Sequence, residues 1–179
     1  MAIYVYGATA QAKMTIDLLE RLHMDIAGCI DKSLLLNTIL DYPVILNHIP
    51  SPNDSYVLAI RNVGLRKRMF EDLNIKQYPI FIHPEACISA HADLEEGTVV
   101  FAHVMIGPDV QVGRQVLLDA GAIVHSNSVI EDFVNIGANV SIGSNVLVGE
   151  GAEIGANSVI GDEVTIEAYS MVPPHTVIL

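Results

Sequence analysis

The chain has 179 residues, of which 51% are hydrophobic and 17% are charged, and its net charge is −12. This composition can bury a core, which excludes a disordered chain, and the length predicts one domain or two small ones. No apolar run approaches the ~20 residues of a membrane span. With no basic leader and only two cysteines, Cys29 and Cys87, the sequence favours a cytoplasmic protein without a membrane span.

Charge is distributed unevenly along the chain. Residues 1–76 hold eight basic and eight acidic residues, whereas residues 77–179 hold thirteen acidic residues and one basic residue, Arg114. Nucleic acid and anionic membranes are therefore unfavourable partners for the second part, because its acidic field repels them. Any anionic ligand bound there meets the same repulsion.

The first part of the chain alternates between strand and helix patterns. Strands are predicted over residues 3–7, 26–30 and 56–60, and helices over residues 12–22 and 65–73. Strand–helix–strand order with short connections predicts a parallel sheet. Ligands of such sheets bind at the carboxyl ends of the strands, which here are residues 7–11, 31–32 and 61–62.

The second part repeats with a period of six residues. Every sixth residue from Ile88 to Val172 is aliphatic, through fifteen consecutive positions without an insertion, and a small or β-branched residue stands four residues after each. A period of six fits neither a helix nor an alternating strand, but it fits short straight strands joined by tight corners.

Such hexapeptides stack into a solenoid, because one unit alone cannot bury its inner face. The aliphatic residue points inward, the small residue fills the next inward position, and Gly or Asn turns the corner, where a positive φ is allowed. Seven of the thirteen glycines directly follow a repeat aliphatic. Three hexapeptides per turn predict a triangular prism of about five coils.

Several segments resemble a known family. They are residues 3–13 (a strand and its loop), 28–31 (Gly-Cys-Ile-Asp), 59–67, 82–84 (Ile-His-Pro) and 119–124 (Asp-Ala-Gly-Ala-Ile-Val). Over essentially the whole chain, the sequence resembles the bacterial nucleotide-sugar acyltransferases, which include sialic acid O-acetyltransferases and N-acetyltransferases of UDP- or GDP-linked amino sugars. The resemblance implies an α/β half-Rossmann, nucleotide-sugar-binding domain over residues 1–82 and an all-β left-handed parallel β-helix (hexapeptide solenoid) over residues 83–179.

The resemblance also implies a reaction and its partners. An acetyl group would pass from acetyl-CoA to an amino or hydroxyl group of a nucleotide-linked sugar, in a homotrimer whose site lies between adjacent prisms and needs no metal. The residues at matching positions for the nucleotide sugar are Gly7, Ala8, Thr9, Asp31, Lys32 and Arg61. Those for acetyl-CoA are Asn135, Gly143 and Gly161.

The expected catalytic residues are His125 and Ser126. Where the family carries Glu-His-Asp, with the histidine as general base, this chain carries His125, Ser126 and Asn127. The resemblance thus places Ser126 at the position of the base, and His125, one residue away, is the imidazole that could replace it. Its orienting partner would be Asp119 or an acidic residue of a neighbouring chain.

Two other interpretations remain open. Acyltransferase prisms usually offer Lys or Arg to the phosphates of CoA, and none stands between Arg114 and Leu179. A catalytically impaired relative, acting as a trimeric scaffold or nucleotide-sugar-binding protein, is therefore the alternative. A metal hydratase of the γ-carbonic anhydrase type is disfavoured, because two of its three histidine ligands need a spacing that His125 does not offer.

Overall fold

The structure, a computed structural model, describes residues 2–32, 36–73, 75–76 and 78–179. The chain divides into two compact units, Met1–Pro79 and Ile80–Leu179. Each unit has a hydrophobic core of its own.

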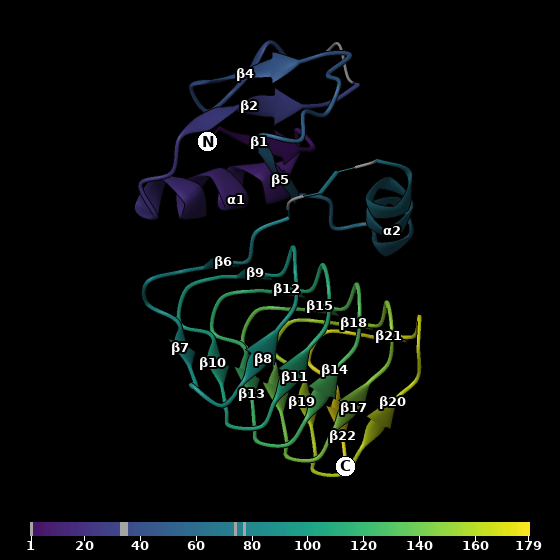
Figure 1. The fold of residues 1–179 in the computed structure, drawn as a ribbon. Helices are drawn as coiled ribbons and strands as arrows, with labels where there is room; N and C mark the ends of the chain where they lie inside the picture. Colours follow the sequence, from purple (N-terminus) through teal and green to yellow (C-terminus); the bar gives the residue numbers. More distant parts are fainter. Residues whose placement is uncertain (1, 33–35, 74, 77) are drawn as a thin grey trace. The chain divides into compact units, whose positions relative to one another are not determined.

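The first unit contains a five-stranded sheet in the order β3-β4-β2-β1-β5 (Figure 1). Its strands are β1 (Ile3–Tyr6), β2 (Ile26–Ile30), β3 (Thr38–Ile39), β4 (Tyr42–Ile45) and β5 (Ser55–Leu58). β1 pairs in parallel with β2 and β5, as the sequence predicts. β4 is parallel to β2, but β3 is antiparallel to β4, so the sheet is mixed. The sequence did not predict these two strands, because β3 has only two residues and β4 contains Pro43.

Two helices accompany this sheet, α1 (Ala10–Arg21) and α2 (Val63–Asp72). α1 forms because apolar residues at helical spacing make a buried stripe that includes Ala12, Ile16 and Leu19. α2 starts about two residues before its predicted start, because the Asn62 side chain accepts a hydrogen bond from the Leu65 N–H at 2.8 Å. The loops that precede both helices follow the carboxyl ends of β1 and β5.

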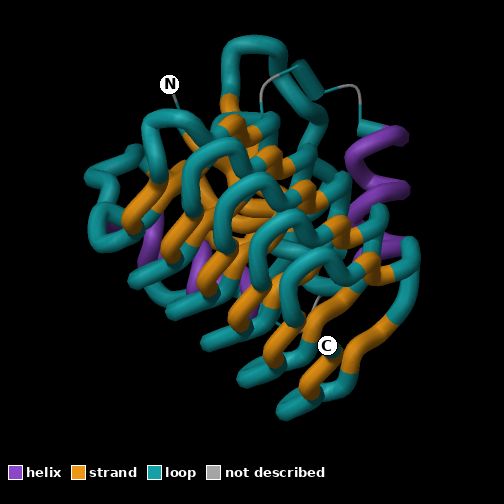
Figure 2. The backbone as a smooth tube through the Cα atoms, turned by 90° about the horizontal axis from the view of Figure 1, so that it is seen from below, coloured by secondary structure: helices purple, strands orange, loops and turns teal. Residues whose placement is uncertain are grey.

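The second unit is a triangular β-solenoid, called the prism below (Figures 1 and 2). Its strands stack in three sheets, and Ile123 pairs with Met105 before it and Ser141 after it, so one coil takes eighteen residues. Face 1 contains β6 (Phe81–Ile82), β9 (Val99–Val100), β12 (Leu117–Leu118), β15 (Asn135–Ile136), β18 (Glu153–Ile154) and β21 (Met171–Val172). Face 2 contains β7 (Cys87–Ile88), β10 (Met105–Ile106), β13 (Ile123–Val124), β16 (Ser141–Ile142), β19 (Val159–Ile160) and β22 (Val177–Ile178). Face 3 contains β8 (Asp93–Leu94), β11 (Gln111–Val112), β14 (Val129–Ile130), β17 (Leu147–Val148) and β20 (Thr165–Ile166).

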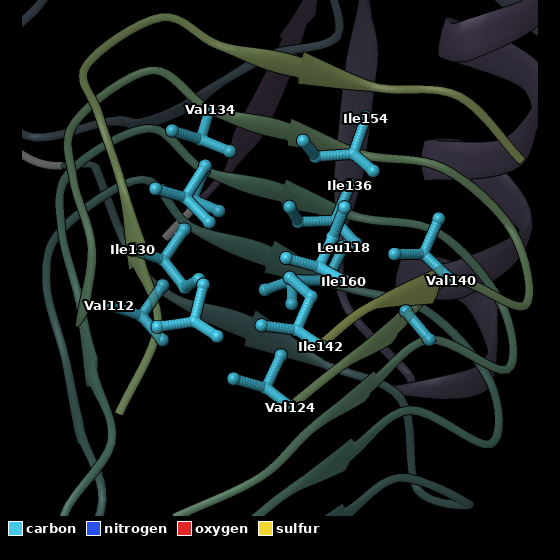
Figure 3. Close-up of a cluster of buried hydrophobic side chains, with 14 of the residues drawn as sticks. Val112, Leu118, Val124, Ile130, Val134, Ile136, Val140, Ile142, Ile154 and Ile160 are labelled. Atoms are coloured by element: carbon cyan, nitrogen blue, oxygen red, sulfur yellow. The ribbon is translucent and has the colours of Figure 1, made fainter. Parts of the chain in front are cut away.

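The prism interior is filled by the repeat aliphatics, which confirms the predicted inward direction. Figure 3 shows Val124, Ile136 and Ile142 among the side chains that converge there. All three are fully buried. Most of the small residues four positions later, such as Val134 and Val140, fill the remaining inward positions and belong to the same cluster. Each fully buried Val or Ile stabilises the stack by at most about 1.5–3 kcal/mol.

The corners confirm that Asn and Gly adopt a positive φ there, but they correct the role of the glycines that directly follow a repeat aliphatic. A left-handed φ occurs at the third residue after a repeat aliphatic, as at Asn127 (63°) and Gly121 (73°). The glycines directly after the aliphatics do not adopt it. At Gly137, a Cβ would instead lie 2.7 Å from the Ala156 nitrogen of the next coil. These glycines therefore permit close stacking of coils rather than a special backbone conformation.

Candidate functional sites

The loop after β1 is joined to the end of β2. Gly7 has a φ of 110°, and a Cβ there would lie 2.8 Å from the Ala59 carbonyl oxygen. The Gly7 N–H donates to the Ile30 carbonyl at 2.8 Å. The next N–H, of Ala8, donates to Asp31 Oδ2 at 2.8 Å. The structure thus brings together three residues predicted for the nucleotide sugar, and the Asp31 carboxylate shapes the loop.

The carboxyl end of β5 adds a positive charge to the same edge of the sheet. Arg61 Nη1 donates to Gln11 Oε1, in the first turn of α1, at 3.5 Å. Thr9 is the exposed N-cap residue of α1, and Lys32 is exposed directly after Asp31. One acidic residue, two basic residues and a helix N-terminus therefore lie at the carboxyl edge of the sheet, where parallel sheets bind ligands.

His125 lies at a corner of the prism, between β13 of face 2 and β14 of face 3. Its backbone N–H donates to the Ile142 carbonyl at 2.9 Å, and its side chain is exposed. Within the described residues, no side chain hydrogen-bonds the imidazole. Ser126 is half-buried, and its carbonyl accepts from the Asn145 N–H of the next coil at 3.1 Å. The imidazole can therefore meet a ligand from solvent.

The other candidates of the prism lie away from His125. Asp119 is at the corner that precedes β13, so the full width of face 2 separates it from His125. Asn135 is in β15 of face 1, which is opposite the His125 corner, and its Nδ2 donates to Glu153 Oε2 at 3.1 Å. A single chain does not bring these groups together.

Gly143 and Gly161, predicted for acetyl-CoA, are accounted for by coil stacking. A Cβ on Gly143 would lie 2.7 Å from the Asp162 nitrogen, and one on Gly161 would lie 3.2 Å from the Leu179 Cα. Both N–H groups are used in the ladder between coils, since Gly143 donates to Ile160 at 2.8 Å and Gly161 to Ile178 at 2.7 Å.

Face 3 carries an acidic groove that the sequence analysis did not identify. It has a volume of about 650 Å³ and is lined by Asp93, Glu95, Gln111, Val112, Gly113, Val129, Ile130, Glu131, Asp132 and Glu150. Glu95 and Glu131 are two coils apart, at equivalent positions directly after a repeat aliphatic. An eighteen-residue alignment of the repeats would have placed them on one edge.

Arg114, the basic residue of the prism, is bound beside this groove. Its Nε donates to Asp132 Oδ2 at 3.0 Å, its Nη2 contacts the same oxygen, and its backbone N–H donates to Asp132 Oδ1 at 2.7 Å. The hydrogen bond to Asp132 is the main cause that raises the pKa of the guanidinium. Glu95 Oε2 lies 3.9 Å from Nε.

Neither a metal cluster nor a membrane-spanning helix is found in the part of the chain that the structure describes. No three His, Cys, Asp or Glu side chains there are grouped to hold an ion. No helix there has the length and apolar character needed to cross a bilayer.

A family model described as the GMPPB C-terminal domain matches residues 77–178. The chain belongs to this family. Comparison with curated proteins gave no match.

Solved structures share the fold of the whole chain. A variant of the GDP-perosamine N-acetyltransferase of Caulobacter crescentus, in complex with CoA and GDP-perosamine, is 24% identical with a TM-score of 0.93, over 100% of this chain and 89% of that chain. The acetyltransferase domain of PglB from Neisseria gonorrhoeae is 23% identical with a TM-score of 0.93, over 99% and 91%. WeeI from Acinetobacter baumannii is 18% identical with a TM-score of 0.71, over 96% and 94%. The resemblance noted in the sequence is thus confirmed for the fold.

Proposed function

We propose that this protein transfers an acetyl group from acetyl-CoA to an amino or hydroxyl group of a nucleotide-linked sugar. The observation that carries the proposal is the match of the entire chain, both units included, to two acetyltransferases at a TM-score of 0.93. One of them is named for a GDP-linked amino sugar and holds CoA. The acetyltransferase domain of PglB has also been solved with acetyl coenzyme A.

The two units are assigned different tasks. Residues 1–82 act as a half-Rossmann domain for the nucleotide sugar, through Gly7, Ala8, Thr9, Asp31, Lys32 and Arg61. Arg61 supports this assignment, because its guanidinium lies at the carboxyl end of the sheet, where it can pair with a diphosphate. Residues 83–179 act as a left-handed β-helix for acetyl transfer.

His125 serves as the general base. Transfer needs one base and a held thioester, without a covalent enzyme intermediate. His125 takes a proton from the acceptor amine or hydroxyl while that group attacks the thioester carbonyl. The new C–N or C–O bond forms, the C–S bond breaks, and the departing thiolate receives the proton from His125. Ser126, at the position of the family's base, lies beside the reacting groups.

A homotrimer completes the site. The outward residues of face 2 carry no charge, although the prism is strongly acidic; they are Cys87, Met105, Ile123, Ser141, Val159 and Val177. Such a face suits packing against other copies. His125 lies at the edge of this face, where a neighbouring chain can add side chains to the site; Asn135 is not one of them in this structure, because it is buried within its own chain. Light scattering should give a mass of roughly three times 19.3 kDa.

Release of free thiol from acetyl-CoA, measured with UDP- and GDP-linked amino and hydroxyl sugars, tests the proposal. Turnover with at least one acceptor supports it. The alternative of a trimeric scaffold or nucleotide-sugar-binding protein is favoured by the presence of Ser126 in place of a histidine. It predicts calorimetric binding of a nucleotide sugar with no thiol release.

A further inference from the structure

The charge of the prism bears on how an acyl donor is recognised. Residues Ile80–Leu179 contain thirteen acidic residues and one arginine, a net charge of −12. The phosphates of CoA carry about four negative charges at neutral pH. Bringing them near this surface is unfavourable unless local cations or N–H donors offset the repulsion.

The arginine of the prism is committed to other groups. Asp132 binds it through both Nε and Nη2, and Glu95 adds a second carboxylate on the same side. A phosphate would have to displace Asp132 from a bidentate pair, leaving that carboxylate unpaired. Arg114 is therefore a weak phosphate ligand, and its charge is already balanced within the prism.

Three backbone donors on the His125 corner are committed as well. The Gly143 and Gly161 N–H groups belong to the ladder between coils. The next N–H along, of Ser144, donates to Asp162 Oδ1 at 2.7 Å, so a carboxylate already fills the place that a phosphate oxygen would take. The arginine of the prism, at the corner between faces 3 and 1, and these three backbone N–H groups at the His125 corner are thus used internally.

We infer that the prism recognises an acyl-pantetheine thioester, and that the 3′-phospho-ADP end of CoA adds no net binding. This rests on the proposed function and narrows its donor specificity. The first unit differs, since its basic and acidic residues are balanced and Arg61 lies at its ligand-binding edge. The diphosphate of the acceptor is bound there, and the prism binds the uncharged thioester arm.

A comparison of two donors tests the inference. Acetyl-CoA and acetyl-pantetheine are assayed by thiol release with one nucleotide sugar, at low salt and at 0.5 M salt. We expect kcat/KM for the two donors to agree within about threefold, and KM for acetyl-CoA to fall as salt screens the repulsion. A preference for acetyl-CoA of about thirtyfold or more that salt weakens would show that its phosphates are bound, and would overturn the inference alone.

A charge reversal sharpens the test. Glu163 is exposed at the same type of corner as His125, two coils further along. Glu163→Lys should lower the KM for acetyl-CoA severalfold and leave that for acetyl-pantetheine unchanged. Glu167→Lys, an equal charge change at the corner between faces 3 and 1, should have a much smaller effect. Absence of thiol release from both donors with every acceptor would overturn the proposed function and this inference together.

Discussion

Thr98 forms an internal clamp whose removal tests how the coils are held together. Its side chain is fully buried in the prism. The hydroxyl donates to the Gly113 carbonyl at 2.8 Å and accepts from the Val116 N–H at 3.2 Å, both in the next coil. Ser128 and Ser158 make the same pair of bonds to the coils above them. We predict that Thr98→Val, which preserves shape and removes the hydroxyl, destabilises the prism.

The magnitude follows from the two hydrogen bonds. Each contributes about 0.5–1.5 kcal/mol net, and a buried polar group left without a partner costs about 1–3 kcal/mol. The Val116 N–H can limit this loss by bonding to a carbonyl of its own corner. At an equivalent corner, the Ala122 N–H donates to the Asp119 carbonyl at 3.2 Å. The expected loss in free energy of unfolding is therefore about 1–3 kcal/mol. No cavity contributes, since Val and Thr have nearly equal volumes.

Urea denaturation followed by far-ultraviolet circular dichroism measures this loss. Thr165→Val is the matched control, since Thr165 is exposed in β20, and it should change stability by less than about 0.5 kcal/mol. The reasoning is refuted if Thr98→Val unfolds at the same urea concentration as the parent protein, or if the control is destabilised as strongly.

Three further predictions concern the core, the base and the thiols. Ile142→Asp should prevent folding of the prism, because it buries an unpaired carboxylate at a cost of several kcal/mol; a native melting temperature would contradict this. His125→Ala should lower turnover by about 10²–10⁴-fold while calorimetric affinity for the nucleotide sugar stays unchanged; undiminished turnover would exclude it as the base. Burial raises the pKa of the Cys29 thiol to about 11, whereas Cys87 is exposed. An aromatic disulfide reagent at pH 8 should thus modify Cys29 only after unfolding, and its prompt modification in the native protein would contradict the assigned burial.

Local patterns predicted most of the architecture. The six-residue period indicated three short strands per coil. Each two-residue strand points one side chain inward, so only one residue of each strand must be aliphatic. The three strands of the first unit were also read correctly, since their apolar runs are bounded by polar residues or glycine. β3 and β4 were missed, because β3 is too short for a pattern, Pro43 interrupts β4, and only pairing with neighbouring strands (β3 with β4, β4 with β2) orders them. The glycines after the repeat aliphatics were misinterpreted, because composition alone does not separate a positive φ from a close approach between coils.

The sequence predicted which residues belong to the candidate site, but the fold determined how these residues are arranged. The sequence by itself determined that His125 follows an inward aliphatic, that basic residues are confined almost entirely to residues 1–76, and that Asp31 and Arg61 end predicted strands. Only the tertiary structure decided that Asp31 binds the loop at Ala8, that Asp132 holds Arg114, and that Asn135 lies on the face opposite His125. The physical reason is that these relations join residues far apart in the chain. Coil stacking and sheet pairing bring them together or keep them apart, and neither is encoded in any single hexapeptide or strand.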